Sequence, residues 1–520
     1  MHEELLRLIK DRGLLLEKEI FDLLNSLDNP QSAKNFLEGL ERYSGEKMIT
    51  RSMLAHHSSY LKQVVSSLEG QDKTRVENTF ITLGLHLEVR KEEKIISMPL
   101  KSLERSYQIF TADTKTDKKL TVGDFVGNFR ARYSQLQRML MQRPDLSSLM
   151  SIGKISSNRQ QLSIIGMVRE KRVTKNKNII ILLEDLTGEI QTLVRADKGE
   201  LAGIAHELQL DDVIGIKGSG NRDMLFIQDI FFPDAFLAEK SRFEEEICIA
   251  FLSDLHCGSD RHLGDSLQNF IAWIRSNDPL AHKIKYLFFV GDNVDGVGIF
   301  PGQEHVLKLK SMKEQYALLA SYLRQIPPHI TMFMCPGQHD AVRVAEPQPI
   351  ISAAYASELY TLDNLIQVTN PTLVKILEGQ KEFKVLMYHG ASIHTLINDI
   401  PELRIMKAHR TPAKAVRHML KRRHLAPTHS SVVYIPNIAR DPLVIHEVPD
   451  VLCTGEVHRL DIENYNGVLI ITGSCWQAQT PFEEKVGNIP DPCKVPVLNL
   501  KTRELKILDF TDEGGESNGN

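Results

Sequence analysis

The sequence predicts a multidomain protein in which a small β-barrel precedes a larger α/β domain. Its 520 residues exceed what one hydrophobic core normally supports, so two or three domains are expected. Short strand-like runs separated by turn-like segments fill residues 150–235, which is typical of a small barrel. From 246 to 510, apolar runs alternate with segments of helical spacing, and this alternation indicates an α/β domain.

The composition is that of an ordinary soluble protein, with 42% apolar and 25% charged residues. The formal net charge is −4, so any surface for nucleic acid must be local. The six cysteines form no Cys-x-x-Cys pair, which disfavours a zinc ribbon and favours a reducing, cytoplasmic setting. The chain start does not resemble a signal peptide. No apolar run reaches the roughly 20 residues that span a bilayer, so no membrane association is expected.

Residues 1–45 are expected to form a small helical module. Apolar residues recur there every three or four positions, as between Leu5 and Leu24. So small a module buries little surface, and a solvated helical extension is an equal alternative. Residues 46–118 are polar and uneven and are expected to be a partly disordered linker. The acidic tail 511–520, rich in Gly, Ser and Asn, is expected to be disordered.

Residues 119–240 are expected to contain a lead-in helix and an OB-type barrel. One apolar stripe marks the helix at 121–143, and Pro144 ends it. Five short strands and one helix then fit an OB-type barrel. Such barrels often hold single strands on aromatic side chains in a basic groove. The strands here carry almost no aromatic residues, so a packing or subunit-contact barrel is favoured over a strong single-strand binder.

The α/β domain opens with two apolar runs that stop at potential metal ligands. The run 247–252 leads to Asp254 and His256. The run 286–290 leads to Asp292, and the segment between the runs has helical spacing, so the strands are expected to be parallel. Functional groups collect beyond the carboxyl ends of parallel strands. Carboxylate oxygen together with imidazole nitrogen suits hard and borderline divalent metals.

Three later apolar runs end in the same way. Their ends carry, in order, Gln338, His339 and Asp340, then His389, then Glu456 and His458. A lone Asp-x-His motif is weak evidence, and a site there would be expected in roughly one case in ten. Five such runs in succession predict a metal site.

The five blocks resemble the signatures of calcineurin-like metallophosphoesterases: Asp-x-His, Gly-Asp-x-x-Asp, Gly-Asn-His-Asp, a lone His, and Gly-His-x-His. The resemblance covers 246–510 and implies a β-sandwich flanked by helices. Within this superfamily the chain is most similar to the small subunits of archaeal D-family DNA polymerases. That similarity rests on the stretches 251–256, 337–343, 345–349 and 421–427, and on the order of helical region, linker, barrel and phosphoesterase.

The resemblance implies a site with two divalent metal ions. Asp254, His256, Asp292 and His458 would hold the first, and Asp292 would bridge to a second held with Gln338, His389 and Glu456. Two metals about 3.5–4 Å apart can activate water and hold phosphate oxygens through an in-line displacement. His339 would stabilise the transition state or protonate the leaving oxygen, and Asp340 would orient it. Asp295 is either a partner of a ligand or a cap on the next segment.

Two blocks depart from the family pattern at the second metal. Gln338 stands where the family has Asn, and Glu456 stands where it has His. Both offer oxygen, which favours manganese, or magnesium, over zinc. A misplacement of about 1 Å can cost about a hundredfold in rate. Nuclease activity is expected, and an inert scaffold is the alternative.

Positive charge gathers between 404 and 424. Such a run is usually a solvated face, but beside a nuclease site it can grip phosphates, and the two interpretations are equally supported. Arg343, Arg422 and Arg423 are the candidate DNA contacts.

The resemblance implies the small subunit of a heterodimeric archaeal replicative DNA polymerase, whose partner is a large catalytic subunit. The chain would carry a proofreading 3′–5′ exonuclease for single-stranded or mispaired DNA ends. A non-catalytic scaffold for the large subunit and a stand-alone phosphoesterase for a small phosphoester are the alternatives. The barrel, and the stretches around Arg343 and Arg422, count against the stand-alone enzyme.

Overall fold

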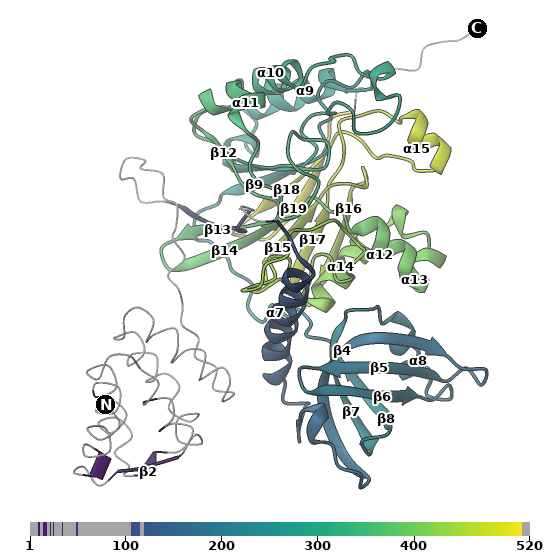
Figure 1. Cartoon of the computed structure of the whole chain (residues 1–520). Helices are drawn as coiled ribbons and strands as arrows, with labels where there is room; N and C mark the ends of the chain where they lie inside the picture. The colour runs from purple at the N-terminus through teal and green to yellow at the C-terminus, as the bar shows by residue number, and fades with distance from the viewer. Residues whose placement is uncertain are drawn as a thin grey trace. The chain divides into compact units, whose positions relative to one another are not determined.

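The computed structural model describes residues 106–114 and 119–511, with scattered residues between 9 and 49 (Figure 1). The chain divides into two units, 1–102 and 103–520. In the first unit, β1 (Leu15–Leu16) pairs in parallel with β2 (Met48–Ile49). The predicted helical module, most of the predicted linker and almost all of the predicted tail lie outside the described residues.

The α/β domain is built on two six-stranded sheets (Figure 1). The first has the order β12 (Leu365–Gln367), β11 (Thr331–Cys335), β10 (Ile284–Val290), β9 (Cys248–Leu252), β18 (Lys494–Asn499) and β19 (Leu505–Asp509). The second has the order β16 (Asp461–Tyr465), β17 (Val468–Thr472), β15 (Val451–Thr454), β14 (Lys381–Met387), β13 (Thr372–Glu378) and β3 (Tyr107–Thr111). Strands β9 to β12 run parallel, as do β14, β15 and β17.

Strand β3 reaches the second sheet from before the barrel. It pairs antiparallel with β13, with Thr111 opposite Thr372 and Tyr107 opposite Ile376. The sequence predicts a partly disordered linker at these residues, and β3 is an ordered part of that segment. The strand has only five residues, YQIFT, and lies at a sheet edge between polar segments, so its signal in the sequence is weak.

The central strands β9, β10, β11 and β15 are buried on both faces, which explains their continuous apolar runs. On β10, Phe288 and Val290 pack into the core between the two sheets, whereas Leu287 and Phe289 face the helices that cover the first sheet. Those helices are α9 (Gly264–Ile274), α10 (Met312–Leu323) and α11 (Ala353–Ala356). The second sheet is covered by α12 (Ile393–Asp399), α13 (Pro401–Ile405) and α14 (Ala413–Arg422). The result is a sandwich of two sheets flanked by helices.

Short helical segments connect these elements. They are η2 (Ala281–Lys283), η3 (Gln303–His305), η4 (Ser357–Thr361), η5 (Ala408–Arg410) and α15 (Pro481–Val486). None of the helices in the described part of the chain combines the length and the apolar character needed to cross a membrane.

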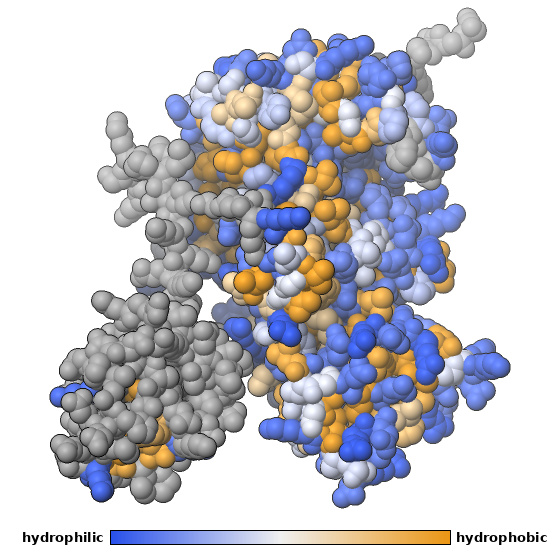
Figure 2. All heavy atoms as spheres, in the orientation of Figure 1, coloured by the Kyte–Doolittle hydropathy of each residue, from blue (hydrophilic) through white to orange (hydrophobic). Residues whose placement is uncertain are grey.

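A closed five-stranded barrel occupies part of 119–240. Its strands follow the order β4 (Gln160–Val173), β5 (Ile179–Asp185), β6 (Gly188–Val194), β8 (Leu225–Phe231) and β7 (Val213–Gly220), with η1 (Ile152–Lys154) and α8 (Gly199–Glu207) beside them. Its core is aliphatic, and Figure 2 shows further apolar side chains on its outer surface. A shallow cavity of about 210 Å³ on that surface is lined by Ile180, Leu182, Glu170, Arg172 and Gln191.

Helix α7 (Val122–Met141) links the barrel to the α/β domain. Thr121 and Asp124 form a capping box at its start, which fixes where the helix begins. Arg132 on α7 donates from Nε to Asp441 Oδ2 at 2.7 Å, and both side chains are 1% exposed. His424 Nε2 lies 3.1 Å from the same oxygen of Asp441. A buried charge cluster therefore joins α7 to the α/β domain.

Candidate metal centre

The loops that follow β9, β10, β11, β14 and β15 converge at the carboxyl ends of the two sheets. They bring together Asp254, His256, Asp292, His389, Glu456 and His458. Gln338 belongs to the same site, because the preceding residue, Gly337, lies against Asp292 and His389. A Cβ at Gly337 would lie 2.2 Å from Asp292 Oδ1 and 2.7 Å from His389 Nε2. Only glycine therefore allows this loop to approach so closely.

The backbone of this centre is strained. Left-handed φ angles occur at Asp254 (51°), His256 (45°), Asp292 (46°), Glu456 (73°) and His458 (57°). Each such residue costs on the order of 1–3 kcal/mol and persists only where the surrounding structure imposes it. Strain of this kind clusters at functional sites, and five cases among the predicted ligands favour such a site here.

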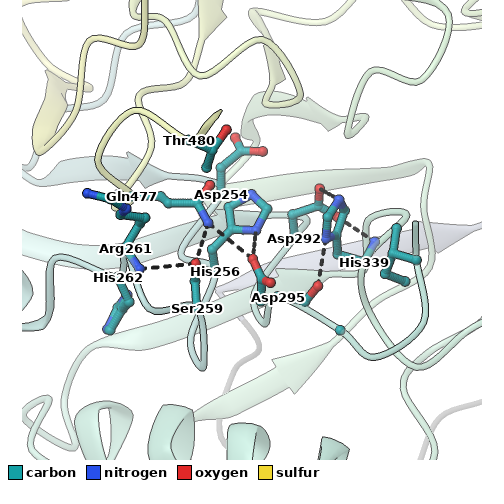
Figure 3. A network of polar contacts seen from close by, with 12 residues as sticks. Asp254, His256, Ser259, Arg261, His262, Asp292, Asp295, His339, Gln477 and Thr480 are labelled. Atoms are coloured by element: carbon teal, nitrogen blue, oxygen red, sulfur yellow. Dashed lines mark hydrogen bonds and ion pairs between the residues drawn. The ribbon is translucent and has the colours of Figure 1, made fainter. Parts of the chain in front are cut away.

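The first ligand group comprises Asp254, His256 and His458. Figure 3 shows Asp254 and His256, with the contact between His256 and Asp295. The Nε2 atoms of the two imidazoles lie 3.0 Å apart, and Asp254 Oδ1 is 3.6 Å from His458 Nε2. The Nδ1 atoms face carboxylates instead: His256 Nδ1 is 3.0 Å from Asp295 Oδ1, and His458 Nδ1 is 3.0 Å from Glu483 Oε1. When each Nδ1–H donates to its carboxylate, both Nε2 lone pairs face one point, which is how metal-binding histidines are usually held.

The second group comprises Asp254, Asp292 and His389. His389 Nε2 lies 3.2 Å from Asp292 Oδ2 and 3.3 Å from Glu456 Oε2. Its Nδ1 lies 2.9 Å from the carbonyl oxygen of Val290, which fixes the ring orientation when Nδ1–H donates. Asp254 thus belongs to both groups, whereas the sequence resemblance implies Asp292 as the shared carboxylate.

Two oxygen atoms of the predicted ligands are buried and make no hydrogen bond to any described residue. They are Asp254 Oδ2 and Gln338 Oε1. A buried polar atom without a partner costs about 1–3 kcal/mol, so two at one site need an explanation. Divalent cations would satisfy both oxygens, and the site also offers the imidazole nitrogen atoms that such cations bind. The residues therefore fit a metal centre.

The carboxylates of this centre also set the charge of its imidazoles. Burial would lower the pKa of His458, but the Glu483 hydrogen bond and Asp254 outweigh it and raise the pKa to about 9. Burial likewise opposes a charged His389, yet Asp292 raises its pKa well above the usual range. Protons on these imidazoles thus balance the carboxylates, and a metal ion would displace them.

His339 stands beside the two ligand groups. Its backbone N–H donates to Asp292 Oδ1 at 2.8 Å, and its Nδ1 lies 2.7 Å from the carbonyl oxygen of Asp295. The ring meets that of His256 edge-on, with centroids 4.9 Å apart. His339 Nε2 is 4.0 Å from Asp292 Oδ2, and the side chain remains 22% exposed. The Nδ1 atom of His339 is therefore fixed by the Asp295 carbonyl, while its Nε2 atom lies close to the candidate metal ligands.

Asp340 does not have the predicted role of orienting His339. Its Oδ2 accepts hydrogen bonds from the Gly337 backbone N–H at 2.9 Å and from Asn293 Nδ2 at 2.9 Å. Its Oδ1 accepts from Tyr316 at 2.9 Å. Asp340 therefore ties the loop after β11 to the loop after β10, and it supports the ligands through the backbone.

Asp295 is a hydrogen-bond partner of His256, which is the first of the two roles expected for it. The residues that support it were not predicted from the sequence: Gln477 Nε2 and Gln303 Nε2 each donate to its carboxylate at 3.1 Å. Glu483 lies 25 residues after His458 in the chain. The pattern Thr480-x-x-Glu483 marks a capping box in the sequence. It does not indicate which imidazole the carboxylate reaches.

The predicted DNA contacts at Arg422 and Arg423 are wrong. Their exposed fractions are 3% and 7%. Arg422 Nε donates to Asp212 Oδ1 on the barrel at 2.8 Å, and its Nη2 donates to the carbonyl oxygen of Glu207 at 2.9 Å. Arg423 Nε donates to the carbonyl oxygen of Ile445 at 2.7 Å. Both guanidinium groups are therefore used to hold the fold together.

Arg343 shapes a loop instead of presenting a free cation. Its Nη2 donates to the carbonyl oxygen of Pro347 at 2.7 Å, and its Nε donates to that of Ala345 at 3.1 Å. The side chain is half-buried. Two of its donors are thus occupied by the loop that follows the third block.

Comparison with known proteins gives one family match and several close relatives. Residues 249–460 match the model of a family described as the B-subunits of DNA polymerases alpha and epsilon. The DNA polymerase II small subunit of Methanothermobacter thermautotrophicus is 35% identical over 417 residues, covering 78% of this chain and 84% of the relative. That of Pyrococcus horikoshii is 30% identical over 511 residues, covering 96% of this chain and 80% of the relative.

The corresponding protein of Pyrococcus furiosus is 35% identical over 405 residues, but this chain spans only 64% of its length. Among solved structures, one titled as a novel archaeal phosphodiesterase aligns at 12% identity with a TM-score of 0.26, covering 50% of this chain and 99% of the other. That likeness is too low to support an argument. The identity and coverage of the first two relatives are decisive: the chain belongs to the DNA polymerase II small subunit family.

Proposed function

We propose that this chain is the small subunit of a heterodimeric archaeal replicative DNA polymerase and that its α/β domain is a two-metal 3′–5′ exonuclease. The substrates are single-stranded or mispaired DNA ends, and the partner is a large catalytic subunit. Family membership supports the role in the polymerase. The nuclease rests on one observation: two buried ligand oxygens without hydrogen bonds, Asp254 Oδ2 and Gln338 Oε1, lie at one centre with oriented imidazoles. The closed barrel beside it is taken to be of OB type.

Each of the two ligand groups would hold one metal ion. Asp254, His256 and His458 would hold one ion. Asp292 and His389, with Gln338 and Glu456, would hold the other, and Asp254 belongs to both ligand groups. Bound divalent cations supply Lewis acidity toward phosphate oxygens and water. The second group is richer in oxygen than its family counterpart, which favours manganese, with magnesium as the second choice.

His339 is the residue best placed to act on the phosphodiester. With Nδ1 fixed on the Asp295 carbonyl, Nε2 remains to donate to a phosphate oxygen or to the leaving 3′ oxygen. Burial opposes a positive charge on His339, but Asp292 and the Asp295 carbonyl outweigh it and raise the pKa. A protonated imidazole is what both roles require.

The alternative is a non-catalytic scaffold, and one feature favours it. Gln338 and Glu456 alter two ligands of the same metal, so a misplaced second ion would leave the fold intact and the chemistry slow. The buried contacts of Arg422 with the barrel serve a scaffold equally well.

An exonuclease assay with Mn²⁺ on a 3′-labelled primer separates these functions. It uses the full chain, alone and with the large subunit, and the His339→Ala variant of each. His305→Ala is the matched control, because His305 is exposed and its one ion pair among the described residues is with the neighbouring Glu304. Nucleotide release that is lost only in His339→Ala supports the nuclease. No release by the wild-type complex, with polymerase activity intact, supports the scaffold.

A further inference from the structure

The basic run at 404–424 divides into two halves with different environments. In the second half, Lys421 Nζ lies 2.7 Å from Glu207 Oε2, and Arg422 is buried against the barrel. In the first half, Lys407 and Arg410 are exposed, and neither forms an ion pair with any described residue. The second half is therefore structural, whereas the first half leaves positive charge available at the surface.

The exposed half, residues 404–410, is called the basic ridge below. It runs from the end of α13 through η5, and both elements pack against α12. Lys407 has a left-handed backbone, with φ 54°, which turns the chain between the two helical segments. Ile405 is 80% exposed and Met406 is 36% exposed, so apolar side chains stand beside the cations.

Two contacts connect the basic ridge to the metal centre. His394, on α12, places Nε2 3.6 Å from Glu456 Oε1, and its ring stacks on that of His409 with centroids 5.4 Å apart. Arg459, the residue after His458, donates from Nε to the carbonyl oxygen of Arg410 at 3.0 Å. The basic ridge is therefore connected to the metal centre through His394, which contacts Glu456, and through Arg459, which follows His458.

We propose that the basic ridge, together with His394 and His409, is the track that holds single-stranded DNA next to the scissile phosphate. Lys407 and Arg410 would contact backbone phosphates, and Ile405 and Met406 would contact bases without sequence preference. His394 would position the strand where the track meets Glu456. The inference rests on the proposed nuclease function and names the part of the surface that the substrate uses.

A strand of nucleic acid fits these observations better than a protein partner. Protein interfaces are depleted of charge at their centre, whereas the exposed apolar residues here lie between Arg404 and Lys407. Unpaired cations beside a phosphodiester site match the polyanion that such a site would cleave. Arg422 and Arg423 are buried and do not reach a phosphate, whereas Lys407 and Arg410 on the basic ridge are exposed.

The test compares the double variant Lys407→Glu/Arg410→Glu with the control Lys501→Glu/Lys506→Glu in the full chain. Lys501 and Lys506 belong to β19 and the turn before it, near Asn499, which pairs with Cys248 at the amino end of β9. They are therefore away from the carboxyl ends of the strands. Two readouts are used: anisotropy of a labelled 20-nucleotide single strand from 50 to 300 mM salt, and hydrolysis of bis(p-nitrophenyl) phosphate with Mn²⁺.

The ridge variant is expected to bind the strand at least tenfold more weakly. Its slope of log affinity against log salt should be shallower by about 1.4, because each phosphate contact on a single strand contributes about 0.7. Hydrolysis of the small diester should be unchanged, because that substrate does not reach the ridge. The control variant should behave as the wild type in both readouts.

Strand affinity and salt slope equal to the wild type would overturn the inference. So would a ridge variant that binds the strand normally but no longer co-purifies with the large subunit, since the ridge would then be a protein interface. Failure of the wild type to hydrolyse the small diester counts against the nuclease and not against the ridge, because strand binding is measured independently of cleavage. Ile405→Ser is a further check: it should weaken strand binding while leaving the salt slope unchanged.

Discussion

Glu483→Gln is expected to weaken metal binding without destabilising the fold. The Glu483 side chain is buried, and its Oε1 lies 3.0 Å from His458 Nδ1. Its Oε2 accepts hydrogen bonds from the Thr480 backbone N–H at 2.9 Å and from the Thr480 hydroxyl at 3.0 Å, which forms the capping box of α15. Glutamine can complete a capping box as glutamate does, so the helix start should persist. The change removes the negative charge that faces the imidazole.

The size of the effect follows from the role of that carboxylate. Changing a residue that orients a metal-binding imidazole typically costs 10–100-fold in metal affinity, which is about 1.4–2.7 kcal/mol. Titration calorimetry with Mn²⁺ at pH 7.5 measures it, with Glu484→Gln as the control because that neighbouring carboxylate is exposed. Unchanged Mn²⁺ affinity in Glu483→Gln would refute the placement of His458 as a ligand. A large drop in melting temperature would instead indicate a mainly structural role.

Three further predictions concern the loops and the junction between domains. Gly337→Ala should reduce Mn²⁺ affinity at least tenfold in calorimetry, because the new Cβ would overlap Asp292 and His389; wild-type affinity would contradict the described loop path. Arg132→Met should lower the free energy of unfolding by about 3–5 kcal/mol in urea titrations, because it removes the guanidinium that balances the buried charge of Asp441; Arg132→Met with Asp441→Leu should recover most of that loss. Burial lowers the pKa of His424, so the folded protein resists protonation of this imidazole. The free energy of unfolding should therefore fall as the pH drops below about 6.5, the pKa of histidine in the unfolded chain. A melting temperature that is flat from pH 8 to pH 5 would exclude this.

The candidate metal ligands could be picked out from the sequence because each has a local signal. An apolar run buried on both faces, followed at once by Asp or His, marks the carboxyl end of a strand, as at Asp254 and His389. In the fold, the carboxyl ends of these strands lie together at one edge of the two sheets. Gln338 and Glu456 were found in the same way, because their positions in the blocks are fixed even though their residue types depart from the family.

Residues whose roles depend on distant partners were not predictable. Arg422 is in a basic run, and only the fold brings it to Asp212 on the barrel, 210 positions earlier. Strand β3 is a run of five residues between polar segments, and it becomes a strand through its pairing with β13. Asp340 follows His339 directly in the sequence, yet its carboxylate turns to Asn293 and Tyr316.

The most direct test of the metal centre is anomalous diffraction at the manganese edge from crystals of the chain grown with Mn²⁺. Two peaks are expected, one beside His256 and His458 and one beside Asp292 and His389. A single peak beside the first pair would mean that Gln338 and Glu456 do not hold a second ion, which would favour the scaffold. The absence of any peak here, at saturating Mn²⁺, would contradict the metal centre itself.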